Sequence, residues 1–413
     1  MVPKGWTLGT LKDLADTIMG YAFRSEDFVP TGIPLLRMGN LYQNTLDLNR
    51  NPVYLPDSFK VDYKRFLVSP GDLVMSMTGT MGKRDYGFTV EIPSNTQCSL
   101  LNQRVLKIVP KNNASSGYIL NLLRSELILS VLYSFPGGTK QANLSAKQLQ
   151  ELPVLIPPEL EQKKIAQILS TWDKAISVTE KLLTNSQQQK KALMQQLLTG
   201  KKRLLDENGV RFSGEWEVVR LKQLIHEEKK RNRDNHIQRV LSVTNHSGFV
   251  LPEEQFSKRV ASEDVSTYKI VKKNQYGYNP SRLNVGSFAR LDNYDEGVLS
   301  PMYVVFSINH ERLNSDYFLN WMSSNEAKQR IAGSTQGSVR DSVGFDALCS
   351  FSFSLPTLME QQKIAAVLSA ADAEMSMLEK KLACLKEEKK ALMQQLLTGK
   401  RRVNVESEET VSA

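Results

Sequence analysis

Two stretches of the chain carry apolar residues at the alternating three- and four-residue steps of helices that pack along a seam. In the C-terminal stretch the seam positions are Leu368, Ala371, Met375, Leu378, Leu382, Leu385, Leu392 and Leu396, interrupted only by Lys389. The earlier stretch keeps the same register with Leu169, Trp172, Ile176, Leu183, Leu193 and Leu197, but places Thr179, Ser186 and Lys190 in the seam. A seam of this length needs a partner, so the pattern predicts two long helices packed on each other as an antiparallel coiled coil. The alternative is that each helix packs only on its own domain.

The two stretches are copies of one another. Lys190–Lys201 reads KKALMQQLLTGK, and Lys389–Lys400 repeats it letter for letter at an offset of 199 residues. At the same offset and without a gap, Glu161–Ser170 (EQKKIAQILS) matches Glu360–Ser369 (EQQKIAAVLS). Chance does not supply twelve consecutive identities inside a longer ungapped match, so the chain contains an internal duplication.

Each copy has the start and stop signals of a helix. Pro157 and Pro158 end an apolar run and stand where a helix begins. Good helix formers then dominate until Gly200 in the first copy and Gly399 in the second, where glycine favours a helix end. A second capping signal within Ser170–Asp173 leaves two predictions open for the first copy: one continuous helix of roughly 60 Å, or two consecutive helices.

A fainter echo marks the beginning of each half, because Trp6, Leu11, Lys12 and Leu14 recur as Trp216, Leu221, Lys222 and Leu224. The chain therefore divides into a first variable region (1–157), a first helix (158–203), a second variable region (204–356), a second helix (357–402) and a tail (403–413) that we expect to be disordered. Both variable regions alternate short strands, turns and short helices but share little identity. The predicted fold class is α+β, with two mixed regions joined by the two helices in a pseudo-twofold repeat.

Composition narrows the function classes. The formal net charge of +9 favours a polyanionic partner. The three cysteines are far apart, which suits a reducing cytoplasm and no disulfide framework. No apolar stretch is long enough to span a bilayer, and the first residues lack the apolar core of a signal peptide. We therefore expect a cytoplasmic protein.

The order of a domain, a helix that begins EQKKIA and ends LLTGK, a second domain and the same helix again resembles the specificity subunit of type I restriction-modification systems. The resemblance covers residues 5–402. Besides the helices and the Trp and Leu residues near each domain start, it rests on GDLVMSMTGT (Gly71–Thr80), LNQRV (Leu101–Val105) and YNPSRLNVGS (Tyr278–Ser287). It implies a prokaryotic protein in which each variable region is a target-recognition domain that reads one half of a split site in double-stranded DNA.

The resemblance also implies partners. The paired helices would hold the two readers at a fixed spacing and dock methyltransferase subunits, two of them if the same surface is used twice. Restriction subunits are the further partners that this family implies. Methylation and ATP-driven cleavage belong to those subunits, so S-adenosylmethionine and ATP are expected on them and no cofactor on this chain.

Base reading needs polar and basic side chains on loops, with other cations on phosphates. The predicted DNA-contacting residues of the first region are Arg37, Asn40, Thr78, Lys83, Arg84, Lys140 and Gln141. Those of the second region are Asn245, Arg282, Asn284, Gln336, Ser338 and Arg340. For each of them the alternative is an ordinary solvated loop residue.

Catalytic motifs are incomplete. Asn279–Arg282 (NPSR) lacks the second proline and the aromatic residue of an amino-methyltransferase loop. Gly79–Lys83 (GTMGK) is too short between its glycines for a phosphate-binding loop. The four histidines have no metal-ligand spacing. We therefore expect no catalytic residue and no metal site.

A second class of function stays open, namely an adaptor that binds or mimics DNA and captures methyltransferase subunits without directing modification. A mimic of DNA is expected to be acidic over its recognition regions, whereas this chain is basic.

Overall fold

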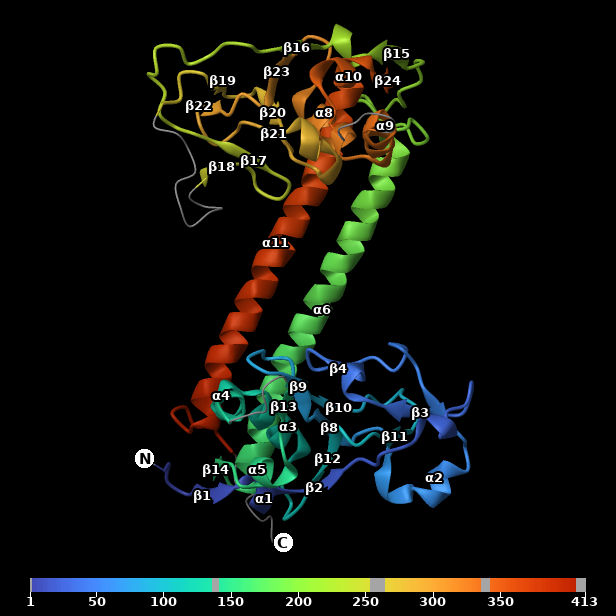
Figure 1. Ribbon diagram of the computed structural model, residues 1–413, viewed down its shortest axis with the longest axis vertical. Coiled ribbons are helices and arrows are strands. Elements are labelled where there is room, and N and C mark those ends of the chain that lie inside the picture. Colours follow the sequence, from blue (N-terminus) through green and yellow to red (C-terminus); the bar gives the residue numbers. More distant parts are fainter. Residues whose placement is uncertain (1, 136–140, 253–263, 336–341, 406–413) are drawn as a thin grey trace. The chain divides into compact units, whose positions relative to one another are not determined.

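The computed structural model describes residues 2–135, 141–252, 264–335 and 342–405 (Figure 1). Its contacts divide the chain into two compact units. Unit 1 comprises Met1–Glu180 and Lys380–Ala413, and unit 2 comprises Lys181–Glu379. Because α6 (Glu159–Leu197) and α11 (Leu358–Leu397) both cross this division, each unit combines one variable region with half of each long helix.

The first variable region is a mixed fold of short strands and helices. Its elements in chain order are β1 (Thr7–Thr10), α1 (Leu11–Leu14), β2 (Ala15–Met19), η1 (Ser25–Asp27), β3 (Ile33–Leu36), η2 (Met38–Asn40), β4 (Leu41–Tyr42), β5 (Thr45–Leu46), β6 (Tyr54–Leu55), α2 (Phe59–Asp62), η3 (Lys64–Phe66), β7 (Leu67–Val68), β8 (Leu73–Ser76), β9 (Thr78–Thr80), β10 (Thr89–Glu91), β11 (Ser99–Leu101), β12 (Val105–Pro110), α3 (Ser116–Arg124), α4 (Glu126–Ser134), β13 (Gln141–Asn143), α5 (Ala146–Gln150) and β14 (Pro153–Ile156). A central antiparallel sheet has the strand order β10-β8-β12-β2. A second sheet, β6-β3-β11-β7, is mixed, since β11 runs parallel to β3 and antiparallel to β7.

The second variable region repeats the central sheet with different surroundings. Its described elements are β15 (Glu217–Arg220), η4 (Leu221–Gln223), β16 (Ile225–Glu227), β17 (Ser242–Thr244), β18 (Gly248–Val250), β19 (Lys269–Lys272), β20 (Tyr276–Tyr278), η5 (Pro280–Val285), β21 (Phe288–Arg290), β22 (Glu296–Leu299), β23 (Val304–Ile308), α8 (Ser315–Met322), α9 (Asn325–Thr335), α10 (Phe345–Ser350) and β24 (Ser352–Leu355). The antiparallel order β16-β23-β20-β21 corresponds to β2-β12-β8-β10 of the first region. Strands β17 with β18 and β19 with β22 form two separate pairs. The predicted α+β repeat is therefore confirmed.

Each variable region has a capped helix at the same position of the repeat. The Ser115 hydroxyl caps α3, and the Asn314 side chain caps α8, 199 residues later. A glutamine at the start of a long helix holds each cap: Gln162 accepts a hydrogen bond from the Ser115 backbone at 3.0 Å, and Gln361 accepts one from the Asn314 backbone at 2.8 Å. The duplication therefore extends from the long helices into the helical part of each region.

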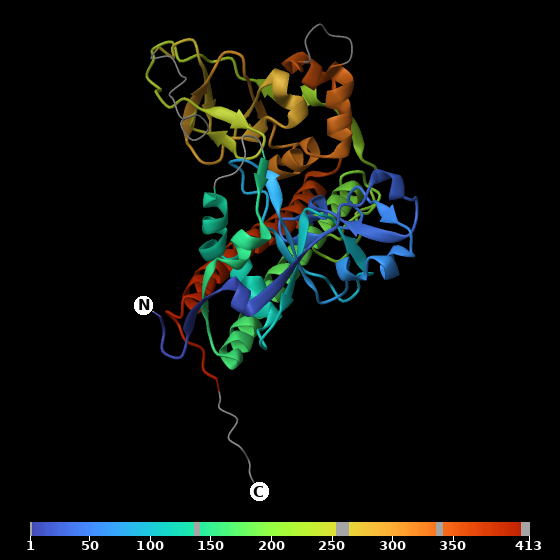
Figure 2. The same ribbon diagram turned by 60° about the horizontal axis from the view of Figure 1, so that its bottom comes forward.

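The two long helices pack antiparallel within each unit. In unit 1, Lys389 on α11 pairs with Asp173 on α6 at 2.6 Å. In unit 2, Lys190 on α6 pairs with Asp372 on α11 at 2.5 Å. The second pair is the first with the two copies exchanged, and the opposite chain directions of the helices can be followed in the colours of Figure 2. The predicted antiparallel pairing is therefore confirmed, and α6 runs through Ser170–Asp173 without a break.

Among the apolar seam residues, full burial occurs only nearest the helix ends, whereas the polar seam residues Thr179 and Ser186 are buried in the middle of α6. Leu169, Leu197, Leu368 and Leu396 are fully buried, and they complete the cores of the variable regions. The remaining apolar seam residues are half-buried: Trp172, Ile176, Leu183, Leu193, Ala371, Met375, Leu378, Leu382, Leu385 and Leu392. Both predicted kinds of packing therefore occur, with the helix ends in the region cores and the middle turns against the other helix.

In each unit a buried glutamate connects segments that are far apart in the sequence. Glu161 in unit 1 accepts hydrogen bonds from the Trp6 indole at 3.0 Å and from the Arg402 guanidinium. Unit 2 repeats this with Glu360, which accepts from the Trp216 indole at 3.1 Å and from Arg203 at 2.6 and 2.7 Å. We call each trio a Trp-Glu-Arg clamp. It ties the start of a variable region to the beginning of one long helix and to the segment that follows the other.

Within the described ranges, no helix combines the length and the apolar character needed to cross a membrane.

Candidate nucleic-acid interface

Five of the predicted DNA-contacting residues of the first variable region lie on two neighbouring loops: Arg37, Asn40, Thr78, Lys83 and Arg84. One loop follows β3 and starts at Arg37, and the other starts in β9 and continues through Arg84. The loops touch where the Thr78 hydroxyl donates to the Met38 sulfur at 2.8 Å. The structure therefore brings both groups of predicted residues to one part of unit 1.

Asn40 stabilises the first loop from inside. Its amide nitrogen donates to the backbone oxygens of Asp47 at 2.8 Å and Arg50 at 3.0 Å, and its Oδ1 accepts from the Arg37 backbone at 2.9 Å. The side chain is only 3% exposed. Both amide protons are thus engaged, and Thr78 is similarly buried on Met38. The expectation that these two side chains reach DNA is at odds with their burial, and their evident work is to shape the loops.

Arg37 is half-buried beside this network. Its Nη2 donates to the backbone oxygen of Asn51, whereas its buried Nε has no hydrogen-bond partner in the described part of the chain. The Arg37 guanidinium therefore has donor capacity that the described residues do not use.

Arg124 anchors the hairpin of β4 and β5 and was not predicted from the sequence. Its Nε donates to the Thr89 backbone at 2.8 Å and its Nη2 to the Asn44 backbone at 3.2 Å. Asn44 Oδ1 in turn accepts from the Thr89 backbone at 2.9 Å. Burial lowers the pKa of Arg124 below its ordinary value. Gln43 and Asn44 both adopt positive φ, as a two-residue hairpin turn requires.

Lys83 and Arg84 are the exposed cations of the second loop. Arg84 contacts both carboxylate oxygens of Glu126 at 3.1 Å and lies 5.0 Å from the centre of the Tyr133 ring. Since the two charged side chains are 59% and 53% exposed, this ion pair contributes little stability, about 1 kcal/mol at most. A phosphate can therefore replace Glu126 as the partner of Arg84 at small cost.

Strand β13 completes this face. It pairs with β9, so that the Gln141 backbone lies opposite Thr80. The predicted contact residue Lys140, like the side chain of Gln141, lies outside the described parts of the structure.

In the second variable region, Asn245, Arg282 and Asn284 are all exposed. Asn245 follows β17, and the other two lie on η5, which ends at Gly286 with φ of 91°. The Ser287 hydroxyl donates to the Val243 backbone at 2.9 Å and so holds the two loops together. A groove of about 520 Å³ is lined by Asn245, Asn284, the neighbouring His246 and residues of α8 and α9. The predicted residues Gln336, Ser338 and Arg340 lie outside the described ranges.

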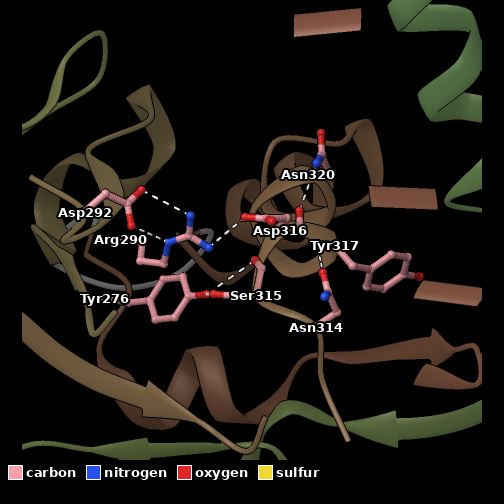
Figure 3. Close-up of polar contacts among 8 residues, drawn as sticks. All are labelled: Tyr276, Arg290, Asp292, Asn314, Ser315, Asp316, Tyr317 and Asn320. Atoms are coloured by element: carbon pink, nitrogen blue, oxygen red, sulfur yellow. Dashed lines mark hydrogen bonds and ion pairs between the residues drawn. The ribbon is translucent and has the colours of Figure 1, made fainter. Parts of the chain in front are cut away.

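A polar network fixes α8 against the sheet beside this groove (Figure 3). Arg290 on β21 binds Asp292 at 2.5 Å and Asp316 on α8 at 2.7 Å, and the Tyr276 hydroxyl on β20 is hydrogen-bonded to the Ser315 hydroxyl. Burial disfavours the charge of Arg290, but the two carboxylates outweigh it and raise its pKa. The first turn of α8 is therefore held rigidly to the central sheet.

The supporting residues of both regions were missed because sequence gives little signal for them. Arg124 is the last residue of an amphipathic helix, and Arg290 the last residue of a short strand, positions where an arginine is ordinarily solvated. Only the fold shows that each one lies beside backbone oxygens or carboxylates that need a donor.

No group of three or more His, Cys, Asp or Glu side chains within the described residues is placed to hold a metal ion.

Comparison with known proteins agrees with this geometry. The sequence model of the family described as type I restriction modification DNA specificity domain matches residues 3–185 and again residues 213–387. The two matches together cover most of the chain, which therefore belongs to this family.

Named relatives are specificity subunits. The putative type I restriction enzyme MjaX specificity subunit of Methanocaldococcus jannaschii is 24% identical over 424 residues, covering 97% of this chain and 95% of that protein. The type I restriction enzyme EcoAI specificity subunit of Escherichia coli is 27% identical over 183 residues, covering 44% of this chain and 30% of that protein.

Solved structures share the fold. The crystal structure of the type I restriction-modification S subunit from M. genitalium matches with a TM-score of 0.59 at 12% identity and covers 96% of each chain. A chain from a study of complex assembly and conformational transition of the type I system matches with a TM-score of 0.55 at 14% identity, covering 97% of this chain and 100% of that one.

Proposed function

We propose that this chain is the sequence-specific DNA-binding specificity subunit of a type I restriction-modification complex and that it recognises a bipartite, gapped DNA site. The observation that carries the proposal is the contrast within the repeat. The helices, their caps and the Trp-Glu-Arg clamps are duplicated, whereas the loop residues differ between the two regions. A duplicated scaffold that presents two unlike loop surfaces suits the reading of two unlike short sequences on one duplex.

The partners follow from a surface feature that both helices repeat. Leu160 and Val178 on α6 are 54% and 56% exposed, and their counterparts Met359 and Met377 on α11 are 57% and 64% exposed. The residues of each pair are 18 positions apart, which is about five helical turns and so places them on one face. Exposed apolar residues repeated in this way favour a partner that docks twice. We identify this partner as the methyltransferase subunit, and restriction subunits as further members of the complex.

Chemistry is assigned to the partners. The chain itself is proposed to be non-catalytic, with S-adenosylmethionine and ATP bound by the methyltransferase and restriction subunits in a prokaryotic cytoplasm. The adaptor alternative is not favoured, because the relatives are named specificity subunits and the chain is basic.

The proposal is tested by mapping DNA methylation in the host with and without this gene. We expect one asymmetric motif, made of two short half-sites around a gap, to lose its methylation when the gene is removed. A gene carrying only the second variable region and the helices is the matched control, and it should not restore that motif. A palindromic or ungapped motif would overturn the proposal.

A further inference from the structure

A basic groove lies in unit 2 between the second half of α6 and the corner where α8 meets α9. Its volume is about 830 Å³, and four of the residues that line it are lysines: Lys190, Lys191, Lys201 and Lys328. One carboxylate, Glu326, lies among them.

The positive charges of this groove are not balanced by ion pairs with the residues that the structure describes. Lys190 is paired with Asp372, and Glu326 is paired with Arg330 at 2.8 Å. The other three lysines are exposed and form no ion pair with any described residue. Three unpaired cations along one groove create a positive potential that attracts an anion.

The groove continues into the loop surface of the second variable region. Ser323 and Lys328 line it, and both also line the neighbouring groove that contains Asn245 and Asn284. The lysines therefore extend the surface on which the predicted DNA-contacting residues lie. A DNA duplex that contacts those loops offers a row of phosphates to this groove, whereas a partner docked on the long helices alone would not need Lys328.

A comparison of the two repeat copies distinguishes a DNA duplex from a protein that docks on the long helices. Lys191 and Lys201 recur in unit 1 as Lys390 and Lys400, but the counterpart of Lys328 is Leu129, and the counterpart of Asn325 is Glu126. A protein that docks in the same way on both copies cannot depend on a charge present in only one of them. The complete set of groove lysines therefore occurs only in unit 2, among the features that differ between the two copies of the repeat.

We propose that this groove binds the phosphate backbone of the duplex beside the half-site that unit 2 reads, through Lys191, Lys201 and Lys328. The inference rests on the proposed function, and it adds that the long helix α6 takes part in DNA binding. Lysines act on phosphates as point charges without sequence preference, and each contact releases counterions. The groove thus adds affinity and fixes position while the loops supply specificity.

The test uses the full-length chain with the three substitutions Lys191→Gln, Lys201→Gln and Lys328→Gln. Binding to a duplex that carries the mapped motif, and to a scrambled duplex, is measured by fluorescence anisotropy across a range of salt concentrations. We expect affinity for both duplexes to fall about 10- to 100-fold, and the slope of log affinity against log salt to decrease by about 2 to 3, since each lost phosphate contact removes about 0.9. The ratio between the two duplexes should stay unchanged.

The matched control is the triple variant K164Q/K181Q/K222Q, which removes three exposed lysines that do not line the groove. It should keep the wild-type salt slope.

If the groove variant keeps that slope while the wild-type chain binds DNA, the inference is wrong and the proposed function stands. If it keeps the slope but no longer captures the methyltransferase subunit, the groove is a protein-docking surface and the inference is equally wrong. If the wild-type chain binds neither duplex, alone or with its partners, the proposed function itself fails.

Discussion

At the scale of single residues, a few buried charges hold each unit together. The Glu360 carboxylate is 1% exposed and depends on Arg203 and Trp216 for its hydrogen bonds. The hydrogen bonds to this carboxylate raise the pKa of Arg203 above its ordinary value. Removing one member of such a buried pair leaves the other without compensation, so this clamp is a sensitive point of unit 2.

We predict that Glu360→Gln lowers the free energy of unfolding of unit 2 by about 3 kcal/mol, because Gln keeps the volume but not the charge that Arg203 needs. Urea denaturation followed by tryptophan fluorescence measures the loss. The matched control is Glu159→Gln, whose partner Lys163 is 60% exposed, and it should change stability by less than about 1 kcal/mol. Equal effects of the two substitutions would show that the clamp is not a stabilising element.

At the level of single elements, each long helix has one face that packs on the other helix and one face that is exposed. The seam face packs the helices on each other, and the residues half a turn away remain uncovered. Leu169 in the seam and Val178 nine positions later illustrate the division, since nine residues rotate a helix by about half a turn. An uncovered apolar face on an otherwise polar helix is typical of a surface on which another protein docks.

Replacing Val178 and Met377 by Asp is expected to weaken capture of the methyltransferase subunit at least tenfold, because a charge would be buried without a partner in the contact. Co-purification and titration calorimetry with the methyltransferase subunit measure this, while DNA binding by the chain alone stays unchanged. Ser177→Asp with Ser376→Asp is the control, as these exposed neighbours occupy equivalent positions on another side of each helix. Loss of capture in the control as well would move the docking surface elsewhere.

At the scale of the whole molecule, both long helices contribute residues to each of the two units. The stretch from Asp173 to Lys190 on α6 has the same number of residues as the stretch from Asp372 to Lys389 on α11. Each helix contributes one residue to the ion pair of unit 1 and one to the ion pair of unit 2, so both pairs require these two stretches to be equally long. A change of length in one helix alone therefore cannot keep both pairs.

We predict that repeating one heptad after Glu180 and one after Glu379 keeps both ion pairs and lengthens each helix by about 10 Å. Methylation mapping should then show the same two half-sites with a gap longer by about three base pairs, given about 3.4 Å per base pair. The heptad inserted after Glu180 alone is the control, and it should lower stability and activity instead. An unchanged gap in the double insertion would contradict the idea that the helices set the spacing.

The duplication, the two long helices and their mutual pairing could be predicted from the amino-acid sequence, because they depend on periodic patterns and on identities such as those of Lys190–Lys201 and Lys389–Lys400. Such features are local or repeated, so one chain read end to end contains them in full. The loops that carry Arg84 and Asn284 could also be predicted as candidate DNA-contacting loops, since turn residues and basic side chains are recognised from the sequence around them.

Which loop side chains are exposed and which stabilise the loops became clear from the three-dimensional fold. Asn40 was expected to reach DNA, but the backbone oxygens of Asp47 and Arg50 take up its amide group. Arg124 is positioned by hydrogen bonds to segments far away in the chain, and Lys328 lines one groove together with residues of α6. A side chain's partners are set by which backbone atoms and charges the fold brings to it, and this information is spread over residues that no local pattern connects.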